Sequence, residues 1–544
     1  MDTIKPLLST GIAVATFLIS CILLNHKILC DASSKTIPHG PSGVPILGAW
    51  HHSIYIDAVS NYRRLKGSFP FLTRYPELTL DKWARKFGDL YSVWLGGQLF
   101  MIISSPKVAK DLMVTHGSVF SSRREMFIKG RTILKGRGVT ATPYNDTWKK
   151  HRRLVTNWLR ADETAKYVLA IERESIDMVQ CLYEASGNGA KFVNPQPFTG
   201  RCSLNVMLGI VFGQRTSTIH DPMMKEALRL SREFMNTTGP FSNLVDHVPI
   251  LRYFPTSIRS RGRRLHRDIV STYGGMIKEM DERIQKGQDI RDCLAKSMLQ
   301  ARKQEDLDDL DITFLATSFM VGGVETTAAV MQWFCALIPS YPEIQRRAQY
   351  ELDSVVGRSR LPGMEDEKSL PFCRAIIKEV QRCHNPFWLG TPHAASKDFV
   401  YQGKLIPKDT VMVLNTWTMH HDEIRHPAPF KFNPDRYLHD NLTSVESSRQ
   451  PDPYQRDHWI FGAGRRICPG MQVAEQEIWL TVSRILWAFD MKPVPDHPID
   501  LKEYDGLSGR SPMPFRILLK PRHEKVKTVL AYAALDGDIA PAPH

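Results

Sequence analysis

Residues 461–470 form the stretch whose residue types and spacing are best suited to chemistry, and they read Phe-Gly-Ala-Gly-Arg-Arg-Ile-Cys-Pro-Gly. A glycine-rich loop of this kind lets the backbone approach a flat cofactor closely. Cys468 directly precedes Pro469, which favours the first position of a helix, so helix amino-terminal amides are expected to favour the thiolate. Because the thiolate is the form that binds metal, the loop predicts a cysteine ligand. An isolated cysteine would more simply be a buried apolar residue.

A second group of residues lies within a long helix that we expect from about residue 310 to 338. Gly322 and Gly323 are adjacent there, although each costs about 1 kcal/mol relative to alanine inside a helix. The pair makes sense if the helix distorts to admit a ligand, whereas the simpler alternative is a glycine that serves packing. An acid and an alcohol, Glu325 and Thr326, follow directly.

The cysteine loop resembles that of the cytochrome P450 family, whose pattern Phe-x-x-Gly-x-Arg-x-Cys-x-Gly is matched throughout. The resemblance covers nearly the whole chain after its amino-terminal segment. It implies haem b (iron protoporphyrin IX) as the cofactor and Cys468 as the axial ligand of the iron. The remaining haem contacts implied by the match are Phe461, Gly464, Arg466, Gly470, Trp148, Arg152 and His393.

Three of these contacts lie outside the loop. Trp148 and Arg152 are four residues apart and therefore share a helix face, and in the family these two positions hydrogen-bond a haem propionate. A basic surface helix is the alternative interpretation of that segment, and it suits Lys149 and Lys150 well. His393 matches another position that contacts a propionate in the family.

The resemblance also implies roles for residues away from the haem-binding loop. In the family, dioxygen binds beside the long helix and an acid–alcohol pair relays protons to it, so Glu325 and Thr326 are the implied catalytic residues. Glu379 and Arg382 lie three apart on a helix and, with Arg436, match a buried Glu–Arg–Arg network. We assign that network to folding and haem retention.

The elements that must position these residues are mostly helices. Amphipathic helical patterns dominate residues 145–304, and the last clear helix is expected from residue 469 to about 488. Short strands are expected near residues 90–95, 99–103, 399–401 and 410–414. Because no composition shift occurs between residues 60 and 520, we predict one large domain that is mainly α with small β-sheets, the cytochrome P450 fold.

Residues 6–25 are uncharged and apolar, and they are numerous enough to cross a bilayer as a helix. We interpret them as a retained transmembrane helix; a cleaved signal peptide is the alternative. The expected organisation is a membrane anchor over 1–30, a proline-rich linker over 31–60, a haem-thiolate monooxygenase domain over 61–525 and a carboxy-terminal tail over 526–544. Basic residues after the apolar segment favour a cytosolic catalytic domain. Together with the resemblance, the single-pass anchor points to the endoplasmic reticulum membrane.

Charge and cysteine content restrict the classes of partner and of structural site that the sequence predicts. Lysine and arginine outnumber acidic residues 71 to 57, which suggests an acidic partner or an anionic membrane surface. No zinc-finger spacing or basic–aromatic pattern supports nucleic acid as a partner. The nine cysteines include no Cys-x-x-Cys pair, which argues against a disulfide scaffold or structural zinc.

The chain has no nicotinamide or flavin fingerprint, so its electrons must come from another protein. The resemblance implies the NADPH–cytochrome P450 reductase, whose docking face is acidic in eukaryotic members. Lys149, Lys150, Arg153 and Arg465 are the candidate basic patch for that contact.

The implied activity is monooxygenation, in which one atom of dioxygen enters the substrate and the other leaves as water. The chain resembles fungal enzymes of secondary metabolism, and among them hydroxylases of small phenols such as m-cresol and 3-hydroxybenzyl alcohol on the way to patulin-like products. Phe387 and Trp388 are candidates for the wall of an aromatic pocket. A larger polyketide or terpenoid substrate remains an alternative, as do a reductase-independent haem-thiolate isomerase or dehydratase and a non-catalytic haem protein. Glu325 and Thr326 argue against the isomerase or dehydratase and against the non-catalytic haem protein.

Overall fold

The computed structural model describes residues 37–41, 75–95, 98–239, 243–247, 249–506 and 509–539. The expected membrane anchor lies outside these residues, as does most of the expected linker. Within them, one helical stretch, Asp309–Ser340, is long and apolar enough to span a membrane. Because 78% of its apolar window is buried inside the protein, that stretch is a core helix.

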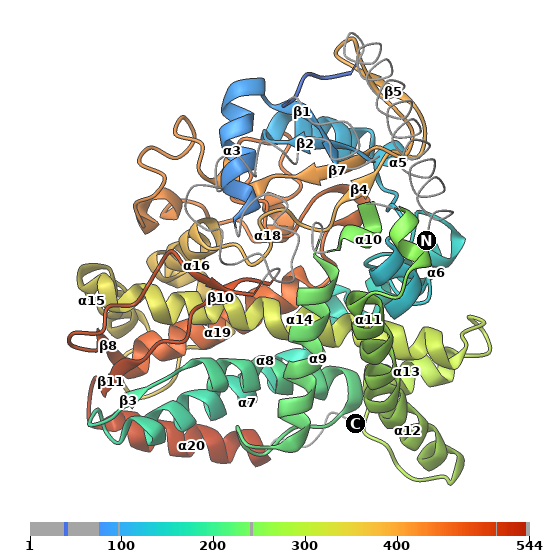
Figure 1. The fold of residues 1–544 in the computed structure, drawn as a ribbon. Coiled ribbons are helices and arrows are strands. Elements are labelled where there is room, and N and C mark those ends of the chain that lie inside the picture. The colour runs from blue at the N-terminus through green and yellow to red at the C-terminus, as the bar shows by residue number, and fades with distance from the viewer. Residues whose placement is uncertain are drawn as a thin grey trace, which may run out of the picture.

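The described chain is mainly helical, as predicted, and helices form most of the body seen in Figure 1. The longer helices are α3 (Pro76–Phe87), α6 (Asp146–Trp158), α7 (Ala161–Ser186), α8 (Gln196–Phe212), α9 (Pro222–Thr238), α11 (Ser257–Ile269), α12 (Gly275–Gln285), α13 (Leu294–Ala301), α14 (Asp309–Leu337), α15 (Pro342–Val355), α16 (Pro371–Cys383), α19 (Met471–Ala488) and α20 (Lys525–Ile539). The short α-helices are α4 (Pro106–Ala109), α5 (Gly117–Phe120), α10 (Leu244–His247), α17 (Thr416–His420) and α18 (Ser444–Ser447). Three short segments of the described chain are π-helical: η1 (Lys110–Thr115), η2 (Phe127–Ile133) and η4 (Val270–Gly274). The 3₁₀-helices are η3 (Pro249–Tyr253), η5 (Ile338–Ser340), η6 (Met364–Ser369), η7 (Pro434–Tyr437) and η8 (Gly464–Arg466).

Four small sheets complete the described fold. The largest has the order β1-β2-β7-β4, and the others pair β10 with β9, β5 with β6, and β11 with both β3 and β8. The strands are β1 (Leu90–Leu95), β2 (Gln98–Ile103), β3 (Phe192–Val193), β4 (His393–Ala394), β5 (Phe399–Tyr401), β6 (Lys404–Ile406), β7 (Val411–Leu414), β8 (Phe489–Pro493), β9 (Tyr504–Asp505), β10 (Ser511–Pro512) and β11 (Ile517–Pro521). The strands expected from aromatic and β-branched runs therefore form, with boundaries that differ by at most one residue.

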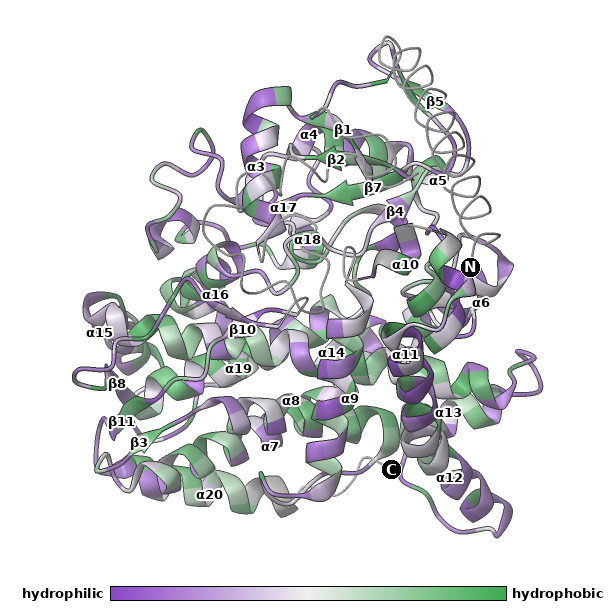
Figure 2. Cartoon of the chain, viewed as in Figure 1, coloured by the Kyte–Doolittle hydropathy of each residue, from purple (hydrophilic) through white to green (hydrophobic). Residues whose placement is uncertain are grey.

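The largest sheet brings two distant segments of the chain to one end of the molecule (Figure 1). Strand β2 pairs with β7 in parallel, so that Phe100 lies opposite Val411. Strand β4 is antiparallel to β7 and places His393 opposite Met412. In Figure 2, β7 is predominantly green because its residues are apolar, and all four of them are buried.

Helix α14 passes through the middle of the helical part and packs against α8, α9 and α19 (Figure 1). It begins with a reciprocal cap, in which the Asp311 backbone N–H donates to the Asp308 carboxylate at 2.7 Å and the Asp308 N–H donates to the Asp311 carboxylate at 3.3 Å. It gives way to η5 at Pro339, which cannot continue an α-helix. The predicted range of 310–338 is thus correct to within one residue.

The paired glycines of α14 do not distort the helix, which is continuous through them. A Cβ atom on Gly323 would lie 2.2 Å from the Met207 sulfur of α8, so this glycine permits close helix packing. A Cβ atom on Gly322 would meet no atom within 4 Å. The two glycines therefore have different surroundings: Gly323 packs closely against α8, whereas Gly322 faces open space.

Two features of the carboxy-terminal part differ from the expected pattern. Helix α19 begins at Met471 rather than Pro469, because Gly470 takes the capping position. The stretch expected to be a tail contains α20, whose Val526 and Leu530 are buried where the helix packs on α7.

Candidate active site

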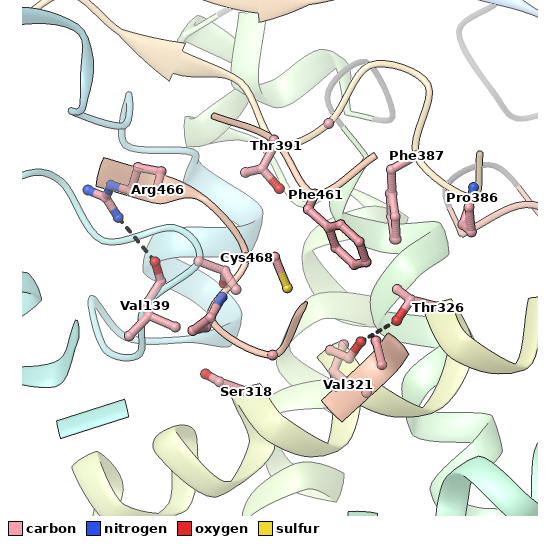
Figure 3. Close-up of a pocket in the computed structure, with 18 of the residues that line it drawn as sticks. Val139, Ser318, Val321, Thr326, Pro386, Phe387, Thr391, Phe461, Arg466 and Cys468 are labelled. Atoms are coloured by element: carbon pink, nitrogen blue, oxygen red, sulfur yellow. Dashed lines mark hydrogen bonds between the residues drawn. The ribbon is translucent and has the colours of Figure 1, made fainter. Parts of the chain in front are cut away.

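A largely apolar pocket beside α14 has Cys468 in its lining, and we refer to it as the Cys468 pocket. Its walls come from α9, α14, α19, η2, the segment before β4 and the loop that carries Cys468. Figure 3 shows the Cys468 sulfur facing a space that Phe461, Phe387 and Thr326 border. Residues from distant parts of the chain therefore meet around one sulfur.

The backbone of the cysteine loop fixes the position of that sulfur. The Cys468 N–H donates to the Phe461 carbonyl at 2.9 Å, which closes the loop on itself. Gly464 has a φ of +63°, and a Cβ atom there would lie 1.9 Å from the Met113 carbonyl oxygen. Only glycine suits this position, since it combines left-handed backbone with a close approach to η1. By contrast, Cβ atoms on Gly462 and Gly470 would meet nothing within 4 Å.

Burial governs the protonation of Cys468 in the protein chain alone. Burial raises the pKa of the thiol, and the Gly470 backbone amide and the Arg152 guanidinium oppose this only in part. The amide effect expected from the following helix is therefore present but does not dominate. Bound metal would deprotonate the thiol outright, because a coordinating thiol loses its proton.

Three arginines gather on one side of the Cys468 pocket without an acidic partner. Arg123 and Arg466 are each less than a tenth exposed, and no carboxylate of the described residues lies within 4 Å of their nitrogens or those of Arg152. Burial and the neighbouring arginines lower the pKa of Arg466 to about 8, and burial and Arg152 lower that of Arg123 to about 9. The Arg123 Nε is buried without a hydrogen-bond acceptor. Such a cluster requires an anion that the described residues do not supply.

Hydrogen bonds hold these cations in place. Arg466 donates to the carbonyls of Ser121 at 2.8 Å, Val139 at 3.1 Å and Thr142 at 2.8 Å, and Figure 3 shows the contact with Val139. Arg152 donates to the Ile467 carbonyl at 2.6 Å, next to the cysteine. The arginines are therefore oriented before any anion arrives.

Two other residues expected at the haem, His393 and Trp148, differ in whether they line the pocket. His393 lines the pocket, and its Nδ1 lies 2.7 Å from the Phe120 carbonyl, which leaves Nε2 for another partner. Burial lowers the pKa of His393. Trp148 is not among the pocket-lining residues; its indole N–H donates to the Val139 carbonyl at 3.1 Å, and its ring lies 3.8 Å from the Arg466 guanidinium carbon. Trp148 therefore packs against Arg466, which itself lines the pocket.

The acid and the alcohol of α14 also separate. Thr326 lines the Cys468 pocket, and its hydroxyl donates to the Gly322 carbonyl of the same helix. Glu325 points instead to α9, where its carboxylate lies 3.4 Å from Arg232 Nε. Arg232 in turn pairs with Asp505 at 2.6 Å. Burial raises the pKa of Glu325 and Arg232 opposes the rise, so only Thr326 is placed directly at the site.

The Glu–Arg–Arg network lies behind the cysteine loop. Arg382 makes two hydrogen bonds to the Glu379 carboxylate, at 2.7 and 2.8 Å, and Arg436 Nε lies 3.3 Å from the same carboxylate. Arg382 also donates to the His420 carbonyl at 2.8 Å, and the Trp459 N–H donates to His420 Nε2 at 2.9 Å. His420 thereby connects the network to the segment that leads into the cysteine loop.

The candidate basic patch is partly neutralised within the chain. Lys149 pairs with Asp146 at 2.9 Å, and Arg153 pairs with Glu305. Lys150 donates to the Asp306 carbonyl, and Arg465 donates to the Tyr144 hydroxyl while remaining exposed. The patch is therefore less basic than its composition suggests.

The pocket fits haem b by the chemistry of its lining. A thiol stands at one side, buried cations suit the two carboxylates of the haem, and apolar residues with open glycine positions suit a flat macrocycle. A model of the family described as Cytochrome P450 matches residues 64–519.

The chain belongs to the cytochrome P450 family.

Curated relatives agree with this assignment. The chain is 31% identical to cytochrome P450 monooxygenase virE of Hypocrea virens, over 90% of this chain and 86% of the relative. It is 30% identical to cytochrome P450 monooxygenase fogE of Aspergillus ruber and 31% identical to cytochrome P450 monooxygenase polD of Polytolypa hystricis, each over at least 92% of both chains. This P450 is thus an oxidoreductase, a monooxygenase of fungal secondary metabolism that binds haem b and takes electrons from a reductase partner.

Sequence reasoning missed several residues of the site. Arg123 and Lys129 line the pocket, and His420 supports it, yet none stands in a pattern that marks it. Their basic character was the available signal for Arg123 and Lys129, but the sequence does not show which of its 71 lysine and arginine residues lack acidic partners in the folded protein.

Proposed function

We propose that this P450 hydroxylates a small phenol, of the m-cresol or 3-hydroxybenzyl alcohol type, with Cys468 as the iron ligand. The single observation that carries the ligand assignment is the Cys468 sulfur in a pocket that also holds Thr326 and the unpaired arginines. Haem bound there supplies the reductive activation of dioxygen at a thiolate-ligated iron.

The protein residues have separate tasks in this proposal. Arg123, Arg152 and Arg466, with His393, bind and orient the haem carboxylates, and Phe461, Gly464 and Gly470 shape the face that receives the macrocycle. Thr326 holds a proton at its hydroxyl beside the reaction space, and Glu325 supplies protons from the side of Arg232. Phe387, which lies outside the cysteine loop, forms an aromatic wall that favours a small ring.

Trp388 does not contribute to that wall. It is 2% exposed and packs edge-on against Trp417, with ring centroids 4.7 Å apart, outside the pocket lining. The aromatic wall of the substrate space therefore comes from Phe387 without Trp388. A larger polyketide or terpenoid is the alternative substrate class, because the pocket lining also extends to Phe234 and Met235 of α9.

Residues 6–25 are proposed to anchor the protein in the endoplasmic reticulum membrane, with the catalytic domain in the cytosol beside the NADPH–cytochrome P450 reductase. The support is the length and apolarity of that segment and the basic residues that follow it.

The test uses microsomes that contain this P450 and its reductase, supplied with NADPH, labelled dioxygen and a panel of small phenols. We expect a phenol to gain one labelled oxygen atom, measured as product mass. Cys468→Ala is expected to abolish both the product and the thiolate–haem absorbance, whereas Cys202→Ala, a buried cysteine outside the pocket, serves as the control. A holoenzyme that oxidises none of the panel would refute the phenol assignment, and a thiolate spectrum that survives Cys468→Ala would refute the ligand assignment.

A further inference from the structure

Lys129 is a buried cation of the Cys468 pocket that none of the roles above uses. It lies on η2, is 6% exposed and belongs to the pocket lining. Its Nζ lies 5.5 Å from the centroid of the Phe234 ring on α9, which also lines the pocket. No carboxylate of the described residues lies within 4 Å of that nitrogen.

The chain itself offers a comparison for this lysine. Among the described residues, Lys378 is the other lysine that is less than a tenth exposed, and it too is 6% exposed. Its Nζ lies 2.8 Å from Asp440, 3.3 Å from Asp457 and 2.7 Å from the Leu442 carbonyl. At equal burial, Lys378 has two carboxylates and a carbonyl, whereas the described residues offer Lys129 only the ring of Phe234.

A single ring does not compensate for the loss of water around an ammonium group, because the cation–π attraction is smaller than the desolvation penalty. Burial, together with the charge of Arg123, accordingly lowers the pKa of Lys129 to about 7. A buried and unpaired donor that faces a ligand pocket indicates that its partner arrives with the ligand.

The haem carboxylates are one possible partner, but they already have a cluster of their own. Arg123, Arg152, Arg466 and His393 surround the cysteine loop, and only Arg123 of these is close enough to perturb Lys129. Lys129 stands instead beside α9, which also presents Phe234 and Met235 to the pocket. We infer that this part of the lining faces the substrate.

We propose that Lys129 is a specificity-determining residue that donates a hydrogen bond to an acidic oxygen on an aromatic substrate. This inference deepens the function proposed above and rests on it. A phenol and an aromatic carboxylate share the required chemistry, and a hydrocarbon ring of the same shape lacks it. The oxygen would fix the orientation of the ring, so that one ring carbon or methyl group faces the reaction space near Thr326.

The test compares three probes that share one methylated ring: m-cresol, 3-methylbenzoate and m-xylene. Their dissociation constants are measured from the change in haem absorbance of the purified holoenzyme, for the wild type and for Lys129→Met and Lys129→Arg. We expect the wild type to bind at least one oxygen-bearing probe more tightly than m-xylene. Lys129→Met should weaken that binding about 10- to 100-fold, the loss typical of a hydrogen bond to a charged group, and leave m-xylene unchanged. Lys129→Arg should restore part of the affinity.

Two further measurements separate the alternatives. Haem content and the substrate-free spectrum of Lys129→Met should match the wild type, and its urea midpoint should be equal or higher because an unpaired buried charge has been removed. Lost haem, or a lower midpoint, would mean that Lys129 serves the haem or an internal partner and would overturn the inference. Equal binding of both oxygen-bearing probes by the wild type and Lys129→Met would also overturn it, while leaving the phenol hydroxylase proposal intact if m-cresol is still hydroxylated. Binding of 3-methylbenzoate alone would support Lys129 and refute the phenol assignment.

Discussion

Replacing Glu379 tests whether the Glu–Arg–Arg network holds the cysteine loop. Glu379 and Arg382 are fully buried, and the carboxylate accepts hydrogen bonds from Arg382, from the Asn433 N–H at 2.8 Å and from Arg436. Glu379→Gln keeps the side-chain shape but leaves the Arg382 charge uncompensated. Breaking one partner of a buried ion pair costs about 3–5 kcal/mol, so we expect a loss of about 3 kcal/mol, because the amide oxygen still accepts one bond.

The chain supplies a matched control on α9. Glu226 and Arg229 have the same three-residue spacing and the same pair of hydrogen bonds, at 2.8 and 2.7 Å, but their side chains are 36% and 45% exposed. Glu226→Gln should cost no more than about 1 kcal/mol.

The assay is urea unfolding of the holoenzyme, followed by helix content and by the thiolate–haem absorbance. We expect Glu379→Gln to lower the midpoint by both probes and to release haem before the helices unfold, since His420 connects the network to the loop. Equal losses in the two variants would refute the argument from burial, and haem retained up to global unfolding would refute the connection to the loop.

Two more outcomes are expected from residues of the pocket. Thr326→Ala should keep haem content but divert NADPH-derived electrons to peroxide; Thr317→Ala, which removes another hydroxyl of α14 from the pocket lining, should not, and unchanged coupling in Thr326→Ala would exclude a proton-holding role. Glu477 of α19 is buried and accepts a hydrogen bond from Ser203 at 2.6 Å, and burial raises the pKa of Glu477 to about 8. A raised carboxyl pKa favours the folded state at low pH, so this contribution is complete below about pH 4.5 and is lost as the pH rises toward 8, by at most about 1.4 kcal/mol per pH unit. Glu477→Gln should therefore flatten the fall in urea midpoint between pH 5 and 8, and an unchanged slope would show that another group titrates.

The sequence by itself determined the family, the helix-rich fold and the cysteine at its centre. Each of these depends on local sequence: the pattern around Cys468, the apolar run that becomes α14 and the short apolar and aromatic runs that become β1, β2 and β7. Local spacing is informative there because helix and strand periods, glycine at left-handed positions and proline at helix starts act within a few residues.

The tertiary structure decided which polar groups face one another. Glu325 pairs with Arg232, and Trp148 packs against Arg466. Lys129 has no carboxylate partner among the described residues, although Lys378 at the same burial has two. These outcomes depend on contacts between segments up to hundreds of residues apart, and on whether burial removes water before a partner of opposite charge comes within reach. No periodicity in the sequence shows which charged side chains meet a partner of opposite charge. The basic residues that are left for a ligand can therefore be recognised only in the tertiary structure.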